Sequence, residues 1–226
     1  MPPLFTIEEI EGTDISDVML AEAAALFSSS YGVWGPLASE KMGKSCKPGN
    51  RITLTPSRLR DQHLPPAAPS ILIRSLSAGQ LAGHALATRW QHAGRTICWV
   101  TQLCVHPALR RQRVATEMLR ALRERHSNAT IFGILSSHPA AILAALRAFG
   151  RGIEEDVDLD MVRGRARGIM DASPVEYVKG AKLVGSLFGR EREDGEASVY
   201  CADTEFWVDH AEPMAALKVV RERGVA

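Results

Sequence analysis

Apolar and polar residues follow a regular order between residues 70 and 150. Apolar stretches such as TICWVTQLCV are dense enough for strands inside a sheet that is covered on both faces. The stretches that follow place apolar residues on one helical face. The pattern predicts β-β-β-α-β-α, with antiparallel strands and then a strand–helix–strand crossover: strands at 70–77, 81–91 and 96–105, a helix over 111–126, a strand at 130–135 and a helix over 139–149.

The flanking regions have weaker patterns. Near the start we expect a strand at 4–10 and a helix capped by Thr13 or Asp14 that runs to about Ser29. The chain between 31 and 70 is rich in Gly and Pro, with one short helix from Thr55 or Ser57 to His63. After residue 150 we expect a helix over 158–170, a strand over 198–208 and a helix over 211–222. A last strand is absent, supplied by a partner, or hidden in 175–190.

These elements suggest one domain over 1–226. Its best-supported core is 70–150, its loop-rich insertion is 31–70, and its least defined part is 151–226.

The composition of the chain excludes some classes of function. The chain has 226 residues, 46% of them hydrophobic, and 27 basic against 26 acidic side chains, for a net charge of +1. Such a balance disfavours a nucleic-acid binder, whose affinity comes from neutralising phosphates. The four cysteines form no Cys-x-x-Cys pair, so we expect no metal site. The start, MPPLFTIEEIEG, lacks the features of a signal peptide and no apolar run is long enough to span a membrane, so we expect a cytoplasmic protein, with a nuclear one also open.

The segment VHPALRRQRVATEML, residues 105–119, carries the clearest chemistry. A buried strand ends there, a loop with three arginines follows, and a helix begins. The first N–H groups of a helix are unpaired and lie at the positive end of its dipole. A strand that leads through a basic loop into a helix therefore suits an anion, and a diphosphate is the natural guest.

This segment resembles motif A of the GNAT superfamily of acyl-CoA-dependent N-acetyltransferases. Val105, Pro107, Arg110 and Ala115 match the pattern V-x-P-x-x-R/Q-x-x-G-x-G/A. The order of elements over 70–150 also agrees, and SSHPAAILAALRAFG is similar to a later motif, with His138 where Asn is usual. The resemblance implies an α/β fold of the α+β type, with a mixed, mostly antiparallel central sheet flanked by helices.

The resemblance also implies acetyl-CoA as co-substrate, held between two strands that splay apart. The acetyl group would pass directly to an amine on a small molecule or a peptide, with no nucleic acid or membrane as partner and a homodimer as an open option. Carried over by position, the cofactor-binding residues are Leu103, Cys104, Val105, Arg110, Arg111, Gln112, Arg113, Val114, Ala115, Thr116 and His138.

Two departures from the family pattern bear on catalysis. Arg113 replaces the first motif glycine, and Ala145 stands where many members carry a Tyr that protonates the departing thiolate. His138, Tyr177 and Tyr200 are the candidate catalytic residues. The strand positions Trp99, Thr101 and Gln102 offer no good base, so a water chain is an option for the general base.

The departures leave a second hypothesis open, a catalytically weakened CoA-binding module with a regulatory or interaction role. Within the enzymes, transfer of a longer acyl group is the rival. The acceptor side is expected near Tyr31 and Trp34, and the acidic residues Asp203, Glu205 and Asp209 share one face if the strand from 198 extends that far. They would then attract a cationic amine, whereas a solvated loop is the simpler interpretation.

Overall fold

The central sheet has the order β1-β2-β3-β4-β5 in the computed structural model, which describes residues 4–150, 159–189 and 201–222. Pairing is antiparallel up to β4, and the crossover from β4 to β5 makes the last pair parallel. The expected mixed, mostly antiparallel sheet is confirmed. Its strands are β1 (Phe5–Glu11), β2 (Ser70–Ser77), β3 (Gln80–His92), β4 (Arg95–Val105) and β5 (Ile131–Ile134).

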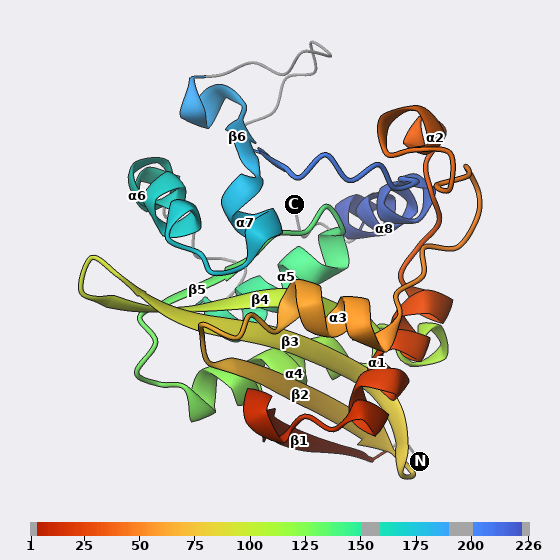
Figure 1. The fold of residues 1–226 in the computed structure, drawn as a ribbon, viewed down its shortest axis with the longest axis horizontal. Coiled ribbons are helices and arrows are strands. Elements are labelled where there is room, and N and C mark those ends of the chain that lie inside the picture. The colour runs from red at the N-terminus through yellow and green to blue at the C-terminus, as the bar shows by residue number, and fades with distance from the viewer. Residues whose placement is uncertain (1–3, 151–158, 190–200, 223–226) are drawn as a thin grey trace.

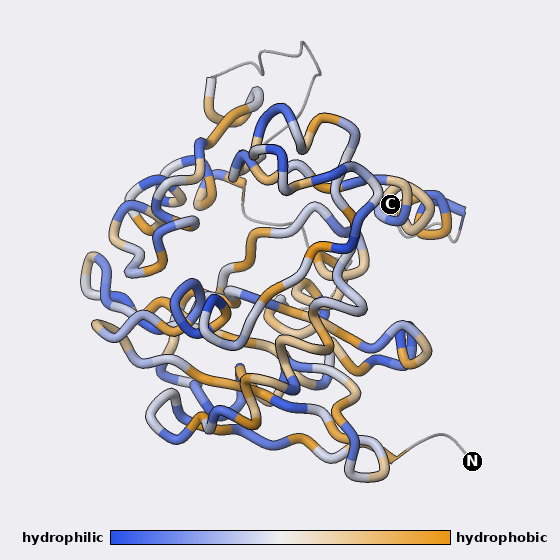
Figure 2. The backbone as a smooth tube through the Cα atoms, turned by 45° about the vertical axis from the view of Figure 1, so that its right-hand side comes forward, coloured by the Kyte–Doolittle hydropathy of each residue, from blue (hydrophilic) through white to orange (hydrophobic). Residues whose placement is uncertain are grey.

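Helices cover both faces of this sheet, as Figure 1 shows. On one face α4 (Val114–Arg125) and α5 (Pro139–Phe149) pack on buried side chains that include Ile71 and Val100. The other face is shared by α1 (Asp17–Ser30) and α3 (Pro56–His63) near one end and by α6 (Leu159–Asp171) and α7 (Glu176–Gly180) near the other. The most hydrophobic segments run through the central strands in Figure 2.

The remaining elements lie outside the main sheet. The short strands β6 (Lys182–Val184) and β7 (Cys201–Asp203) pair with each other in a separate antiparallel sheet. One of the three options for a final strand places it in 175–190; β6 lies in that range, and it pairs with β7 and not with the central sheet. The others are the helices α2 (Ala38–Lys41) and α8 (Ala211–Glu222), with α8 packed on α5, and the 3-10 turns η1 (Gly12–Asp14), η2 (Pro107–Leu109) and η3 (Ser186–Phe188).

Three expected boundaries were wrong. The first helix is capped by Ser16, whose hydroxyl accepts from the Met19 N–H, because Thr13 and Asp14 form η1 instead. The helix expected from 111 begins at Val114, because the preceding loop has left-handed backbone. The strand expected over 198–208 shrinks to β7, since Glu205 turns the chain with φ +55°. Residues 198–200 of that strand lie outside the described ranges.

None of the helices in the described ranges is long and apolar enough to cross a membrane.

Candidate functional site

Strands β4 and β5 separate halfway along β4. Their pairing runs from Ile97 with Ile131 to Val100 with Ile134, where β5 ends. β4 continues to Val105, paired there with β3 alone among the described strands. The backbone of Leu103, Cys104 and Val105 therefore has one side without a strand partner. An extended chain with amide groups could pair with that side, as the resemblance requires of the pantetheine arm.

The separation starts at a β-bulge. Leu86 pairs with Gln102 and Ala87 pairs with Val100, so Thr101 is the extra residue on β4. The Thr101 carbonyl accepts a hydrogen bond of 2.6 Å from the Tyr177 hydroxyl. The Thr101 hydroxyl is buried and has no hydrogen-bond partner among the described residues. Bulges of this kind often lie beside active sites, because they re-aim side chains.

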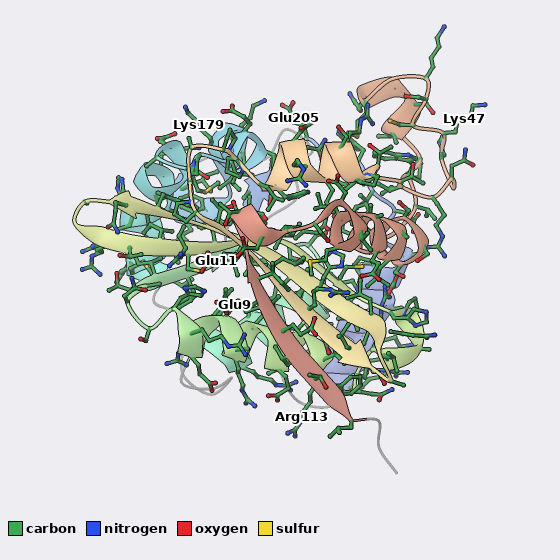
Figure 3. The ribbon with its side chains drawn as sticks, turned by 60° about the horizontal axis from the view of Figure 1, so that its bottom comes forward. Glu9, Glu11, Lys47, Arg113, Lys179 and Glu205 are labelled. Atoms are coloured by element: carbon green, nitrogen blue, oxygen red, sulfur yellow. The ribbon has the colours of Figure 1, made fainter. Side chains whose placement is uncertain are left out.

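In the loop after β4, two arginines have the positive φ angles that glycine usually adopts. Arg111 and Arg113 have φ values of +63° and +65°. Left-handed backbone costs an L-residue about 1–2 kcal/mol, so the surrounding fold must hold it. Arg113 is the N-cap of α4 and makes no side-chain cap. The first amides of α4, from Val114 to Thr116, are left for another partner, while the Arg113 side chain is exposed, as in Figure 3.

Arg110 points away from that helix start. Its guanidinium donates to the carbonyls of Val105 and Ser30 and to the carboxylate of Glu212. It therefore fastens the end of β4 to the C-terminus of α1 and to the start of α8. Among the predicted cofactor residues, Arg111, Gln112 and Arg113 are exposed, whereas Val114 and Thr116 are buried in α4.

His138 lies on the other side of the separation, at the N-cap of α5. Its Nδ1 accepts from the Ala140 N–H at 3.2 Å, and its Nε2 lies 3.7 Å from the Glu212 carboxylate. Burial lowers the pKa of His138, the Glu212 carboxylate opposes that shift, and the Arg110 charge adds to it. A lowered pKa leaves the ring neutral at pH 7, so the contact with Glu212 is not an ion pair there. Glu212 thus contacts both Arg110 and His138, two of the residues predicted to bind the cofactor.

Tyr177 reaches the bulge from α7. Besides its hydrogen bond to Thr101, its ring packs edge-on against His63, with centroids 5.8 Å apart. Burial raises its pKa, so the phenol keeps its proton at neutral pH. Tyr200, the other candidate acid, lies outside the described ranges. Ala145 is buried between α4 and α5 as part of the core.

Sequence reasoning missed two buried histidines beside the bulge. His84 on β3 and His63 at the end of α3 both contact the side chain of Gln102, at 2.7 and 3.3 Å. Burial lowers the pKa of each to about 4. The signal available in the sequence was His84 inside the otherwise apolar run from Leu81 to Ala87. Cys104 is also buried, which raises its pKa to about 12 and makes it a poor nucleophile.

The insertion over 31–70 meets the C-terminal segment. Trp34 forms a bridge with Val208, and the rings of Tyr31 and Trp34 lie 6.3 and 5.2 Å from the ring of Phe206. This aromatic cluster is partly exposed.

The acidic residues expected to share one strand face have local partners instead. Asp203 accepts from the Glu205 N–H, Glu205 pairs with Lys182, and Asp209 accepts from the Ala211 N–H at the start of α8.

One group of residues has metal-ligand chemistry, away from this site. The ligand atoms of Glu9, Glu11 and His126 lie within 4.8 Å of one another (Figure 3 labels the two glutamates). Arg125 lies 3.6 Å from Glu9, and Arg89 lies 3.8 Å from Glu11. The two guanidinium charges balance the two carboxylates, so the group works as an ion-pair network at the outer strand.

Comparison with known proteins finds a similarity to one family over part of the chain. Residues 41–150 match the sequence model of the acetyltransferase (GNAT) family. No curated protein matches the chain. Solved structures that are similar include an aminoglycoside acetyltransferase from an uncultured soil metagenomic sample, in complex with sisomicin, at 11% identity, TM-score 0.45 and coverage of 68% of this chain and 91% of that one.

Two further solved structures come from named bacteria. A ribosomal-protein-alanine N-acetyltransferase from Brucella melitensis biovar Abortus 2308 has 13% identity, a TM-score of 0.38 and coverage of 58% of this chain and 80% of that one. A transcriptional regulator from Bacillus halodurans C-125 has 12% identity, a TM-score of 0.44 and coverage of 69% and 98%. These TM-scores are below 0.5, so the similarity to the GNAT family rests on the sequence match over residues 41–150.

Proposed function

We propose that this protein uses acetyl-CoA to acetylate an amine on a small molecule or a peptide, a proposal supported by the match of residues 41–150 to the GNAT acetyltransferase family model. The observation that carries this proposal is the separation of β4 from β5 at the Thr101 bulge, directly before a helix start without a side-chain cap. An extended amide-bearing chain that ends in a diphosphate fits such an arrangement, because it needs backbone partners along its length and free N–H groups at its end.

The loop residues divide into two roles in this proposal. The amides of Gln112 to Thr116 bind the diphosphate, and the exposed guanidiniums of Arg111 and Arg113 add positive charge around it. The backbone of Leu103 to Val105 pairs with the pantetheine amides. Arg110 acts indirectly. Its contacts with Val105 and Ser30 hold the loop in place between the β4 backbone and the amides that bind the diphosphate.

Acetyl-CoA supplies an activated acyl thioester, so the protein has to position the amine, take its proton and support the leaving sulfur. Tyr177 is the proposed acid, since its phenol is protonated at neutral pH and its hydroxyl lies at the bulge. His138 is neutral at the N-cap of α5 and is the proposed contact beside the thioester. Tyr200 stays a candidate from the sequence. A cytoplasmic location and a homodimer also stay predictions.

The second candidate function is CoA binding without efficient catalysis. The burial of Ala145 in the α4–α5 core favours it, because no phenol can reach the leaving sulfur from that position. Both candidates predict cofactor binding, and amine acetylation separates them.

The test is a calorimetric titration with acetyl-CoA and separately with CoA, followed by thiol-release assays with a panel of amines. We expect micromolar binding of both. Arg110→Ala is expected to weaken binding by about tenfold or more in a folded protein, because the loop loses three anchoring contacts. Arg120→Ala is the matched control, since Arg120 is exposed on α4 and pairs with Glu117.

An unchanged dissociation constant in a folded Arg110→Ala protein would remove Arg110 from the cofactor site. Absence of binding by the wild-type protein would refute both functions.

A further inference from the structure

Glu212, in the first turn of α8, contacts both sides of the separation between β4 and β5. Its carboxylate pairs with Arg110 from the loop after β4, and the same oxygen lies 3.7 Å from Nε2 of His138 at the N-cap of α5. Arg110 and His138 are both predicted cofactor residues. One acidic side chain from α8 therefore bridges the two sides of the proposed cofactor site.

The carboxylate faces the one remaining hydrogen-bond donor of the His138 ring. Nδ1 of that ring accepts from the Ala140 N–H, so the neutral ring carries its hydrogen on Nε2, the atom that faces Glu212. Arg110 holds the carboxylate in that position with one guanidinium nitrogen, while its other two nitrogens bind backbone carbonyls. An oxygen of acetyl-CoA can accept from His138 only after Glu212 has moved away.

The ion pair lies beside the stretch of β4 that has no partner on the β5 side among the described strands. Burial raises the pKa of the Cys104 thiol on that stretch to about 12, and two nearby charges act on the same pKa: Arg110 lowers it and Glu212 raises it. The backbone of Cys104 is one of those proposed to pair with the pantetheine amides. The carboxylate is therefore close to the position of an anionic cofactor, and charges of the same sign repel.

The chain that leads into α8 is fastened to the insertion over 31–70 by backbone hydrogen bonds. The Gly35 N–H donates to the Trp207 carbonyl at 3.0 Å, and the Asp209 N–H donates to the Val33 carbonyl at 2.9 Å. We call residues 206–212 the strap. Because the strap ends on Glu212, these two hydrogen bonds help to set where the carboxylate lies.

The helix after the strap is held less firmly than the helices on the central sheet. No residue of α8 is buried, and the helix packs on α5, beside which it lies in Figure 1. Its apolar side chains, such as Leu217 and Val220, are half-buried. Elements with few buried apolar contacts open locally at a low free energy. The strap and the start of α8 can therefore move without unfolding the sheet.

We propose that the strap is an internal competitor of the cofactor: Glu212 closes the separation between β4 and β5, and acetyl-CoA binds after the carboxylate leaves His138. This inference rests on the proposed function. The observed affinity is then the affinity of the open state, reduced by the fraction of molecules whose strap is open. A variant that opens the strap binds acetyl-CoA more tightly, whereas loss of a residue that holds the cofactor weakens binding.

The experiment measures acetyl-CoA affinity by calorimetry for Glu212→Gln, Glu212→Ala and Gly35→Ala, with thermal unfolding to show that each variant folds. Glu212→Gln keeps the shape of the side chain and removes its charge. Gly35→Ala acts on the strap alone, because the added Cβ would lie 2.8 Å from the Val208 carbonyl oxygen. Glu222→Gln is the matched control, since Glu222 is an exposed carboxylate at the other end of α8, 4.0 Å from Lys218.

We expect Glu212→Gln to bind acetyl-CoA about two- to fivefold more tightly than the wild type, because half-exposed ion pairs are weak. Glu212→Ala also removes the bulk of the side chain and binds at least as tightly as Glu212→Gln. Gly35→Ala shifts the affinity in the same direction, and Glu222→Gln keeps the wild-type affinity. In the wild type, saturation with acetyl-CoA speeds hydrogen exchange of the strap amides, because their hydrogen bonds to the insertion open.

Equal or weaker affinity in both folded Glu212 variants would overturn the proposal, since the carboxylate would then be neutral for the cofactor site or part of it. Unchanged hydrogen exchange of the strap in the saturated wild type would overturn it as well. If Gly35→Ala does not fold, these two measurements decide. A wild-type protein that fails to bind acetyl-CoA refutes the proposed function, whereas a wild type that binds as tightly as the Glu212 variants refutes the strap alone.

Discussion

Replacing Tyr177 by Phe removes only the hydroxyl that contacts the bulge. The ring and its edge-on contact with His63 stay, while the 2.6 Å hydrogen bond to the Thr101 carbonyl is lost. A hydrogen bond of this kind contributes about 1 kcal/mol net, and a partly buried carbonyl left without its partner adds to the loss. We therefore expect the free energy of unfolding to fall by about 1–2 kcal/mol.

The measurements are thermal unfolding and turnover. For a chain of 226 residues, unfolding entropies of globular proteins convert that loss into a melting temperature lower by about 2–8 °C. If Tyr177 protonates the leaving thiolate, kcat also falls by about 10²–10⁴-fold, with the affinity for acetyl-CoA unchanged. Tyr200→Phe is the companion variant, because Tyr200 is the other candidate acid.

Two results would refute this reasoning. A melting temperature within about 0.5 °C of wild type would mean that the hydroxyl adds nothing to the bulge. Full turnover in Tyr177→Phe and in Tyr200→Phe would leave water as the proton source for the thiolate.

Three further predictions address packing and charge. Gly133→Ala is expected to lower the free energy of unfolding by about 1–3 kcal/mol in urea denaturation, because the added Cβ would lie 2.2 Å from the Trp99 ring; Gly164→Ala, with open space around it, should cost nothing. Glu212→Gln should lower the pKa of His138 further, since the carboxylate raises it, and an unmoved NMR titration would contradict this. Acidification from pH 6.5 to 4 should reduce stability, because the two buried histidines beside Gln102 titrate near 4 when folded and near 6.5 when unfolded, so the unfolded chain binds more protons in that window; equal urea midpoints at pH 7 and 4.5 would exclude it.

The sequence by itself predicted the central sheet and the helices around it. Apolar runs such as 70–77 and 139–149 predicted their elements to the residue, because a strand or helix with one or two buried faces must carry a periodic pattern. The loop at 105–119 also predicts an anion site from sequence alone, since backbone amides at a helix start bind anions through local geometry.

The tertiary structure decided the rest. It brought His63 to Gln102, and Glu212 to Arg110 and His138, through contacts between elements far apart in the chain. No local pattern encodes such pairs, because side-chain partners across a fold depend on how helices and strands pack, whereas periodicity reports burial alone. The prediction of a strand over 198–208 was wrong for the same reason. The residues after β7 turn away through local contacts that a strand pattern does not reveal.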